Sequence, residues 1–557
     1  MVRAAGVGPR LAGRDETQDQ GKAQEYRSLR NAPDQVARGH ASTGPRMATL
    51  RFAESDWPSL WSCPPYRSTV SSICRDVNLG IPTRVALLAC ECMSELTALA
   101  ATRLAQLVNG REVTATEVVE AHLERANDLN PTINAITDLQ AGSALEQASQ
   151  VDEDVRRGGP RCSLAGVPVT IKSSIAVKGF RQECGTRLRL GEVAQADAPL
   201  VADLKREGAI VLGTTNVPEF LMAYETDNGI YGRTRSPLNL GFTPGGSSGG
   251  CSAAVAGQIS AGSIGSDAGG SVRVPAHFCG LYGFKPTPGT IPRTGHWPAV
   301  AGPSVLLAGV GPLARTATDL AVLTEITRSN GSDDISCVLQ FDPPWHDPSV
   351  IRVVRVGWFD HAWDTPVTAE TRAAVATAVA AMRERGFQME RIDPVGLERA
   401  PGVWRLMFGK CLRTLIEGSV PQGYRLHPLA YEAMAPDAEF AETTYEELLQ
   451  GWVAQDQLRN RFRKLMDRYT FLLCPVASIP AFRHGERRWM IDGEPVTYPG
   501  AFVYSQVFNV LGAPAATIPV STSSEGLPIG VQLVGLPYDD RSVITAVVEV
   551  AAALGQA

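Results

Sequence analysis

The chain has 557 residues, of which 44% are hydrophobic and 20% are charged, a composition typical of a globular protein with a large buried core. The net charge of −6 gives no basis for expecting a nucleic acid or an anionic membrane surface as a partner. The 11 cysteines have no paired C-x-x-C spacing and H-E-x-x-H is absent, so we expect no metal and no cofactor.

Targeting segments are also not expected. No run of 18 apolar residues without charge occurs, so no membrane span is predicted. Residues 1–30 carry charges of both signs and no apolar stretch, which argues against a secretory signal. With irregularly spaced cysteines that we interpret as reduced and mostly buried thiols, this pattern favours a cytoplasmic enzyme.

The first segment of the chain differs from the rest. Residues 1–92 hold Pro, Arg, Cys and Trp without a helical or strand period, and we expect an unstructured or non-native extension. The alternative is a small accessory domain that packs through apolar side chains, namely Trp57, Leu60, Trp61 and Tyr66. Regular patterns begin near Met93, so residues 93–557 are predicted to form the main domain.

From that point, helical and strand-like segments alternate. The pattern Thr114 to Glu117 fits a capping box that starts an amphipathic helix, and Asn130-Pro131 is expected to stop it. Further expected elements are, in chain order, strand 167–171, helix 197–207, strand 209–212, helix 251–262, strand 352–358 and helix 368–386. This alternation predicts an α/β fold with a largely parallel or mixed sheet.

Two glycine-rich serine turns bracket the expected helix 251–262. The first is Pro244-Gly-Gly-Ser-Ser-Gly-Gly250, and the second runs from Gly265 through Ser271 to Ala276. Glycine allows backbone conformations in which successive N–H groups point into one concavity, where they can hold an oxyanion while a serine attacks a carbonyl. A flexible linker is the alternative interpretation, but the charged Asp267 and Arg273 beside the second turn argue against it.

A nucleophile elbow of the α/β-hydrolase type is a second alternative, because residues 245–249 satisfy G-x-S-x-G. Such an elbow follows an apolar strand directly, whereas residues 236–243 contain polar and glycine breaks and end at Pro244. It also needs a histidine downstream, and His427 and His484 lie in no recognisable setting. An esterase of that type is therefore disfavoured.

The two turns and their surroundings resemble the amidase-signature family, whose pattern is G-G-S-S-G-G followed by G-x-D-x-G-G-S-[IV]-R-x-P-A. Five further blocks resemble the family in the same order: Leu164–Lys172, Gly213–Phe220, Gly280–Thr287, Asn509–Ala515 and Gly526–Gln532. The resemblance covers roughly residues 93–550. It implies one large domain with a central mixed β-sheet flanked by helices, and a serine hydrolase that cleaves amides.

The resemblance also implies roles for individual residues. Ser271 would be the nucleophile that forms an acyl-enzyme, and Lys172 would be the base. Ser247 would relay the proton between them, and in the family the peptide bond at this serine is cis. Lys172 can act only when neutral, so burial must lower its pKa well below about 10.4. The N–H groups of the second turn would form the oxyanion hole, namely those of Ala268, Gly269, Gly270 and Ser271.

Supporting residues follow from the same resemblance. Asp267 and Arg273 would hold the two turns in place, whereas Ser248 either assists by hydrogen bonding or faces solvent as a turn residue. The family pattern usually has Asp, Lys and Arg where this chain has Ser173, Thr214 and Thr290. None of these is a position of the triad, so the departures concern substrate choice and local packing.

The expected substrate is a small-molecule amide. Apolar and aromatic residues after the G-x-T-N block either line the acyl pocket, which favours a hydrophobic or aryl acyl group, or simply fill core: Phe220, Met222, Tyr224, Ile230 and Tyr231. A block like Y-D-G-x-R-Y-G is absent, which favours a free-standing amidase over the glutaminase subunit of a tRNA-dependent amidotransferase. An intact triad argues against a non-catalytic binding module. The preference for amide or ester, and monomer versus homodimer, stay open.

Overall fold

A computed structural model of the chain describes residues 95–299, 302–328, 337, 351, 353–434 and 444–556. The predicted extension, residues 1–92, lies outside the described residues, together with the four apolar residues that favour an accessory domain. The expectation that the main domain begins near Met93 therefore stays a prediction.

An 11-stranded mixed sheet forms the centre of the part of the chain that is described, in the order β1-β3-β2-β4-β6-β5-β12-β13-β9-β7-β8. Strand β2 runs parallel to β3 and β4, and β7 runs parallel to β8 and β9, whereas the other pairs are antiparallel. Its strands are β1 Ile136–Leu139, β2 Pro168–Lys172, β3 Ile210–Thr215, β4 Gly262–Asp267, β5 Tyr282–Lys285, β6 Gly309–Ala314, β7 Arg355–Trp358, β8 Gln388–Arg391, β9 Phe471–Pro475, β12 Ala515–Thr522 and β13 Pro528–Val534. A separate hairpin pairs β10 Arg488–Ile491 with β11 Glu494–Thr497.

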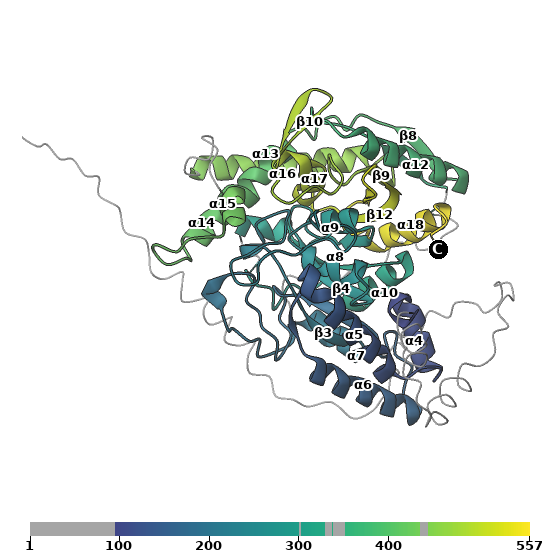
Figure 1. Ribbon diagram of the computed structural model, residues 1–557. Coiled ribbons are helices and arrows are strands. Elements are labelled where there is room, and N and C mark those ends of the chain that lie inside the picture. Colours follow the sequence, from purple (N-terminus) through teal and green to yellow (C-terminus); the bar gives the residue numbers. More distant parts are fainter. Residues whose placement is uncertain are drawn as a thin grey trace, which may run out of the picture. The chain divides into compact units, whose positions relative to one another are not determined.

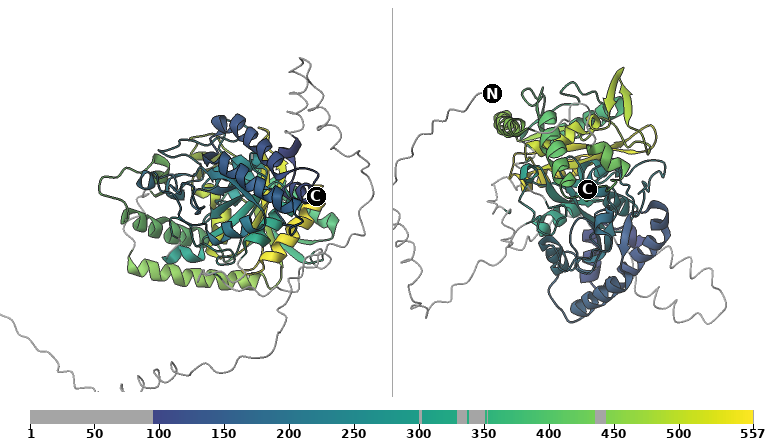
Figure 2. Two further views of the ribbon diagram at one scale, coloured as in Figure 1. Left: turned by 90° about the horizontal axis from the view of Figure 1, so that it is seen from below. Right: turned by 90° about the vertical axis from the view of Figure 1, so that its left-hand side faces the viewer.

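Helices flank the sheet, as the predicted α/β fold requires (Figure 1). Helix α18 packs against α10 and α12 and against strands β12 and β13. Helices α8 and α9 pack against each other, α8 on β2, β4 and β6 and α9 on β5, β12 and β13. Helix α16 runs along the outside (Figure 2). The helices are α4 Ala101–Asn109, α5 Ala115–Ile133, α6 Ala141–Arg156, α7 Pro199–Arg206, α8 Gly249–Ala256, α9 Arg273–Cys279, α10 Ala317–Thr327, α12 Ala369–Arg385, α13 Ala400–Trp404, α14 Cys411–Glu417, α15 Pro428–Met434, α16 Tyr445–Leu465, α17 Val503–Val510 and α18 Asp540–Ala553.

Most of the expected elements lie within a few residues of their predicted bounds. The capping box at Thr114 and Glu117 is formed, but α5 continues through Pro131 to Ile133, and its C-cap Asn134 adopts a left-handed conformation with φ of 53°. Proline in the last turn of a helix removes only one backbone hydrogen bond, so the helix tolerates it. Asn134 then closes the helix by donating its N–H to the carbonyl of Asn130 at 2.7 Å.

The helix expected over residues 251–262 is shorter than predicted. Helix α8 ends at Ala256, and Gly257 caps it by donating to the carbonyl of Ala253 at 2.9 Å. The small residues that follow serve strand packing instead, because β4 begins at Gly262. A Cβ atom on Gly262 would lie 2.7 Å from the end of the Leu323 side chain of α10, so a larger residue there would require that side chain to move.

The side chains of strand β2 alternate between apolar surroundings on one face of the sheet and polar surroundings on the other. Successive side chains of a strand point to opposite faces. Val169 and Ile171 belong to the largest hydrophobic cluster, whereas the hydroxyl of Thr170 hydrogen-bonds Ser260 and Ser263 at 3.0 Å each. Lys172, two residues after Thr170, therefore enters the polar side from the end of a fully buried strand.

Candidate active site

Lys172 is fully buried at the end of β2. Its Nζ lies 2.7 Å from Oγ of Ser247, 3.1 Å from Oγ of Ser266 and 3.2 Å from the carbonyl oxygen of Ser266. Burial lowers the pKa of Lys172 to about 8, although the nearby Cys251, Cys184 and Asp267 oppose the shift. The charged amine therefore still predominates by about tenfold at pH 7, and the neutral form predominates above about pH 8.

Ser247 lies in the first glycine-rich turn, directly before α8. The peptide bond between Gly246 and Ser247 is cis, as the resemblance predicts, and Gly245 has a φ of 89°. A Cβ atom on Gly246 would lie 2.5 Å from the carbonyl oxygen of Glu225. The turn therefore needs glycine at both positions, and it presents the Ser247 hydroxyl to Lys172.

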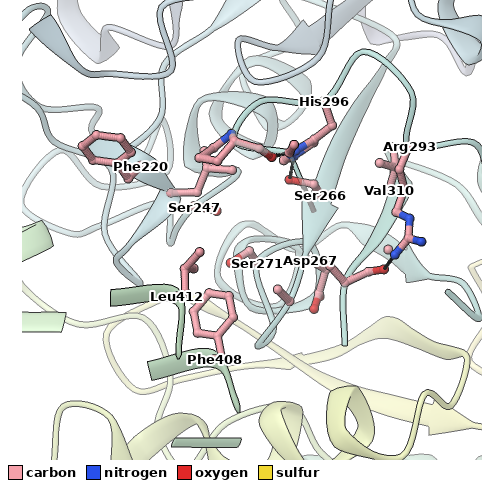
Figure 3. Close-up of a pocket in the computed structure, with 16 residues that line it drawn as sticks. Phe220, Ser247, Ser266, Asp267, Ser271, Arg293, His296, Val310, Phe408 and Leu412 are labelled. Atoms are coloured by element: carbon pink, nitrogen blue, oxygen red, sulfur yellow. Dashed lines mark hydrogen bonds between the residues drawn. The ribbon is translucent and has the colours of Figure 1, made fainter. Parts of the chain in front are cut away.

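Ser271 lies in the second turn, between β4 and α9. The two turns are joined where the N–H of Ser248 donates to the carbonyl oxygen of Ser271 at 3.2 Å. Ser247 and Ser271 line the same pocket, and Ser271 is the more exposed of the two (Figure 3). Ser247 thus contacts the buried lysine and shares the pocket with Ser271, which lies nearer to solvent.

The amide groups of the second turn are available to an anion. Within the described residues, the N–H groups of Ala268, Gly269 and Ser271 have no hydrogen-bond acceptor. The N–H of Gly270, also predicted for the oxyanion hole, donates instead to Oδ1 of Asp267 at 2.8 Å. Three of the four predicted amides therefore remain free beside the pocket.

Side chains from distant segments hold the carbonyl groups of this turn. The indole of Trp404 donates to the carbonyl oxygen of Ala268 at 2.8 Å, and the hydroxyl of Tyr224 donates to that of Gly269 at 2.9 Å. In a trans peptide the carbonyl and the following N–H point in opposite directions. Trp404 therefore fixes the direction of the Gly269 N–H, and Tyr224 that of the Gly270 N–H.

Asp267 and Arg273 form a fully buried ion pair with an N–O distance of 3.0 Å. The Asp267 carboxylate also accepts from the N–H groups of Gly270 and Val272, so it organises the turn that carries Ser271. Although burial alone would raise it, the pKa of Asp267 is held low, chiefly by the Arg273 charge. Arg273 also donates to Gln532 and Asn509 of the C-terminal segments.

Ser248 is buried, which excludes the interpretation of a solvent-facing turn residue. Its Oγ donates to the carbonyl oxygen of Ser266 at 3.3 Å, the same carbonyl that Lys172 contacts. Ser248 therefore links the first turn to the strand that leads into the second.

The pocket that contains both serines is mainly apolar. Its lining is Phe220, Leu221, Ser247, Ser266, Asp267, Ala268, Ser271, Arg293, His296, Pro298, Ala299, Ala308, Gly309, Val310, Phe408 and Leu412. The charged groups in it are engaged, because Asp267 pairs with Arg273 and Arg293 donates to the carbonyl oxygens of Val305 and Ala308. The lining therefore suits an uncharged group.

The five residues predicted for the acyl pocket divide in the structure. Phe220 lines the pocket, and Met222 packs behind it with Ile416 and Ala430. Tyr224 holds the second turn, and Tyr231 donates its hydroxyl to Glu183. Ile230 and Tyr231 are not among the lining residues.

Several residues at the site were not predicted from the sequence: Trp404, Ser266, His296, Phe408 and Leu412. Ser266 occupies the first variable position of the G-x-D-x-G-G-S motif, but the others stand in segments without a recognisable motif. The described residues hold no cluster of metal-ligating side chains. Nor does the described part of the chain include a helix with the length and apolar character that a membrane span needs.

The sequence model of the family described as Amidase matches residues 117–544. The chain belongs to the amidase-signature family. This amidase is a hydrolase that acts on amide bonds, with the α/β fold of its relatives. It is similar to fatty-acid amide hydrolase 2-A of Danio rerio, with 31% identity over 80% of this chain and 87% of the relative. One subunit of the glutamyl-tRNA(Gln) amidotransferase of Thermoanaerobacter pseudethanolicus is 28% identical over 81% of this chain and 95% of the relative.

Solved structures agree with this membership. A 6-aminohexanoate cyclic dimer hydrolase complexed with substrate superposes on the amidase with a TM-score of 0.72 and 26% identity, covering 83% of this chain and 98% of that one. A bacterial aryl acylamidase of the amidase-signature family superposes with a TM-score of 0.71 and 25% identity, covering 82% of this chain and 96% of that one.

Proposed function

We propose that this amidase is a free-standing serine hydrolase that cleaves small-molecule amides with an apolar or aryl acyl group through an acyl-enzyme on Ser271. The observation that carries the proposal is the buried Lys172, whose Nζ lies 2.7 Å from Ser247 beside the pocket that Ser271 lines. A serine hydroxyl becomes a competent nucleophile when a base accepts its proton, and a buried lysine with a lowered pKa can be that base.

In the first half of the reaction, neutral Lys172 accepts the proton of Ser247 while Ser247 accepts the proton of Ser271. The Ser271 oxygen forms a bond to the carbonyl carbon, and the resulting oxyanion is held by the free N–H groups of Ala268, Gly269 and Ser271. The C–N bond then breaks, and the proton passes from Lys172 through Ser247 to the departing nitrogen. An acyl-enzyme and a free amine, or ammonia, result.

Water completes the second half. It attacks the acyl carbon while its proton passes through Ser247 to Lys172, and the bond between the acyl carbon and the Ser271 oxygen then breaks. The proton returns to the Ser271 oxygen, which releases the carboxylic acid and restores the enzyme. The complete reaction consumes the amide and one water molecule, and no step in it uses a cofactor.

The apolar pocket supports the proposed acyl group. A free amino acid such as glutamine would bring an ammonium and a carboxylate into a lining where Asp267 already pairs with Arg273 and Arg293 already donates to backbone carbonyls, which is costly without new partners. Phe220, Phe408 and Leu412 instead offer surface to an alkyl or aryl chain.

A second candidate is the glutaminase subunit of a tRNA-dependent amidotransferase. It is favoured by several relatives that are subunits of glutamyl-tRNA(Gln) amidotransferases, at 28–29% identity over about four fifths of this chain. A panel of aryl amides, alkyl amides, the corresponding esters and glutamine separates the two. We expect kcat/KM for an aryl or alkyl amide to exceed that for glutamine by at least about 10²-fold, because the charged groups of glutamine find no partners. A preference for glutamine would instead support the second candidate.

Labelling with a fluorophosphonate tests the nucleophile. We expect modification of Ser271 in the parent protein, and neither modification nor turnover in Ser271→Ala. Ser252→Ala is a matched control, because Ser252 is also buried near the first turn but donates to the carbonyl oxygen of Pro244. Labelling of Ser247 alone would overturn the assignment and favour the elbow mechanism.

A further inference from the structure

His296 lies in the segment between β5 and β6 and is held against the residues that follow Lys172. It forms an isolated antiparallel bridge with Ile175. On either side of it, the N–H of Trp297 donates to the carbonyl of Ser174 at 2.7 Å, and the N–H of Ala176 donates to the carbonyl of Gly295 at 3.0 Å. The backbone of His296 is thus fixed directly beside the end of β2.

The contacts of the imidazole ring determine which nitrogen carries the proton. Nδ1 lies 2.9 Å from the carbonyl oxygen of Pro298, which can only accept, so Nδ1 is the donor. Nε2 lies 3.0 Å from Oγ of Ser266, and in a neutral ring it must then accept (Figure 3). Burial and the charges of Lys172 and Arg293 lower the pKa of His296 to about 4, against the effect of the Pro298 hydrogen bond, so the ring is neutral near pH 7.

The single hydroxyl proton of Ser266 is therefore directed to His296. Toward Lys172 the Ser266 hydroxyl presents only lone pairs, so Nζ donates to Oγ of Ser266 and, with its other proton, to the carbonyl oxygen of Ser266. A neutral amine has two N–H groups and one lone pair. Both N–H groups are then used, and the remaining lone pair faces Ser247 at 2.7 Å.

We propose that His296 is a positioning residue for acyl transfer, which acts through Ser266 to direct the Lys172 lone pair at the Ser247 hydroxyl. The inference rests on the proposed function, because it concerns how the base is oriented. Without an acceptor at position 296, the Ser266 hydroxyl can turn and donate to that lone pair. Lys172 would then donate to Ser247 instead of accepting from it, which is the wrong direction for a base.

Two substitutions at position 296 separate this role from simple packing. In His296→Phe the acceptor is lost while a ring remains, and we expect the acylation rate to fall by about 10- to 10²-fold with KM little changed. In His296→Gln the side-chain carbonyl can again accept from Ser266, and we expect most of the lost rate to return. His122→Phe is the control, because His122 is a buried histidine that contacts the carbonyl of Ile259, outside the site.

A double-mutant cycle with Ser266 tests whether the effect passes through that hydroxyl. In a Ser266→Ala background, His296→Phe should cause no further loss of acylation rate, because no hydroxyl proton remains to be redirected. Equal losses in both backgrounds, or a parental rate in His296→Phe, would overturn the inference.

Nitrogen-15 NMR of labelled histidine gives a readout that does not depend on activity. The His296 signal, assigned by its absence from His296→Gln, should report a neutral ring with the proton on Nδ1. A proton on Nε2 would overturn the inference. The proposed function fails separately, namely if Ser271→Ala or Lys172→Arg keeps parental turnover, whatever the tautomer of His296.

Discussion

The indole N–H of Trp404 donates to the carbonyl oxygen of Ala268, which lies 136 residues earlier in the chain. This hydrogen bond orients the peptide group that presents the Gly269 N–H to the pocket. Trp404 ends α13, and it stacks on the ring of Phe408 in the pocket wall, with ring centroids 4.9 Å apart. One aromatic residue thus joins the second glycine-rich turn to the wall of the pocket that Ser271 lines.

Trp404→Phe removes the hydrogen bond and keeps an aromatic ring. We expect kcat to fall about tenfold, less than the roughly 10²- to 10³-fold typical of losing an oxyanion donor outright, because the Gly269 N–H is loosened and not removed. KM for a small amide should change little, and steady-state kinetics will show the difference. An unchanged kcat would mean that the turn keeps its shape without the indole.

Lys172→Arg keeps the positive charge but cannot accept a proton. We expect a loss of at least about 10²-fold in kcat/KM at pH 8, measured with the best amide of the panel. Lys205→Arg provides the control, since Lys205 pairs with Asp197 at 2.9 Å in a half-buried contact outside the site and its exchange should leave the rate unaltered. Near-parental activity of the Lys172 variant would assign that lysine a structural role.

The pH dependence of acylation follows from the lowered pKa of Lys172, about 8. Lys172 must be neutral to act as base, so kcat/KM should rise with pH through about 7 to 9 and level off above that range. Burial also lowers the pKa of Lys285, to about 7, but that lysine donates to the carbonyl of Pro286. Lys285→Met should therefore show the same rise of kcat/KM with pH. If the rise disappears in this variant, the group that titrates is Lys285 and not Lys172.

Asp267→Asn leaves the fully buried guanidinium of Arg273 without its counter-charge. Removing one partner of a buried ion pair costs about 3–5 kcal/mol of unfolding free energy, and urea denaturation at pH 7 will measure the loss. Asp467→Asn is the control: its pair with Arg463 is exposed, so the expected change is below about 1 kcal/mol. Similar losses in both variants would contradict the structural role of the buried pair.

A shortened chain tests the domain boundary proposed near Met93. The match to the family begins at residue 117, and the described hydrogen bonds of the site all involve residues from 172 onward. We expect residues 93–557 to keep amide turnover, with a melting temperature within about 2 °C of that of the full chain. A drop of several degrees, or loss of solubility, would show that residues 1–92 belong to the folded enzyme.

Local patterns in the sequence predicted much of the fold. The capping box at Thr114 and the apolar run before Lys172 are interactions between near neighbours, so their elements could be placed to within a few residues. Helix α8 was overextended because small apolar residues fit both a close-packed helix and the glycine-rich start of β4. The spacing of apolar residues along the sequence cannot distinguish a longer helix α8 from the start of strand β4.

The sequence predicts the site residues that lie in a recognisable motif, but not those that reach the site through contacts between distant segments. Lys172, Ser247 and Ser271 stand in recognisable blocks, but Trp404 and His296 contact the surrounding residues across 30 positions or more. The sequence leaves Tyr224 either lining the acyl pocket or filling core, whereas in the structure its hydroxyl donates to the carbonyl of Gly269 in the second turn. Such roles depend on where distant segments meet, which one sequence does not reveal.

The buried network around Arg273 has a consequence for synthesis on the ribosome. Arg273 donates to Asn509 and Gln532, which lie 236 and 259 residues later in the chain. The hydrogen bonds that hold Arg273 beneath Ser271 therefore cannot all form until Asn509 and Gln532 have left the exit tunnel. We expect a stalled nascent chain ending before Asn509 to be inactive toward amides, although it already contains Lys172, Ser247 and Ser271.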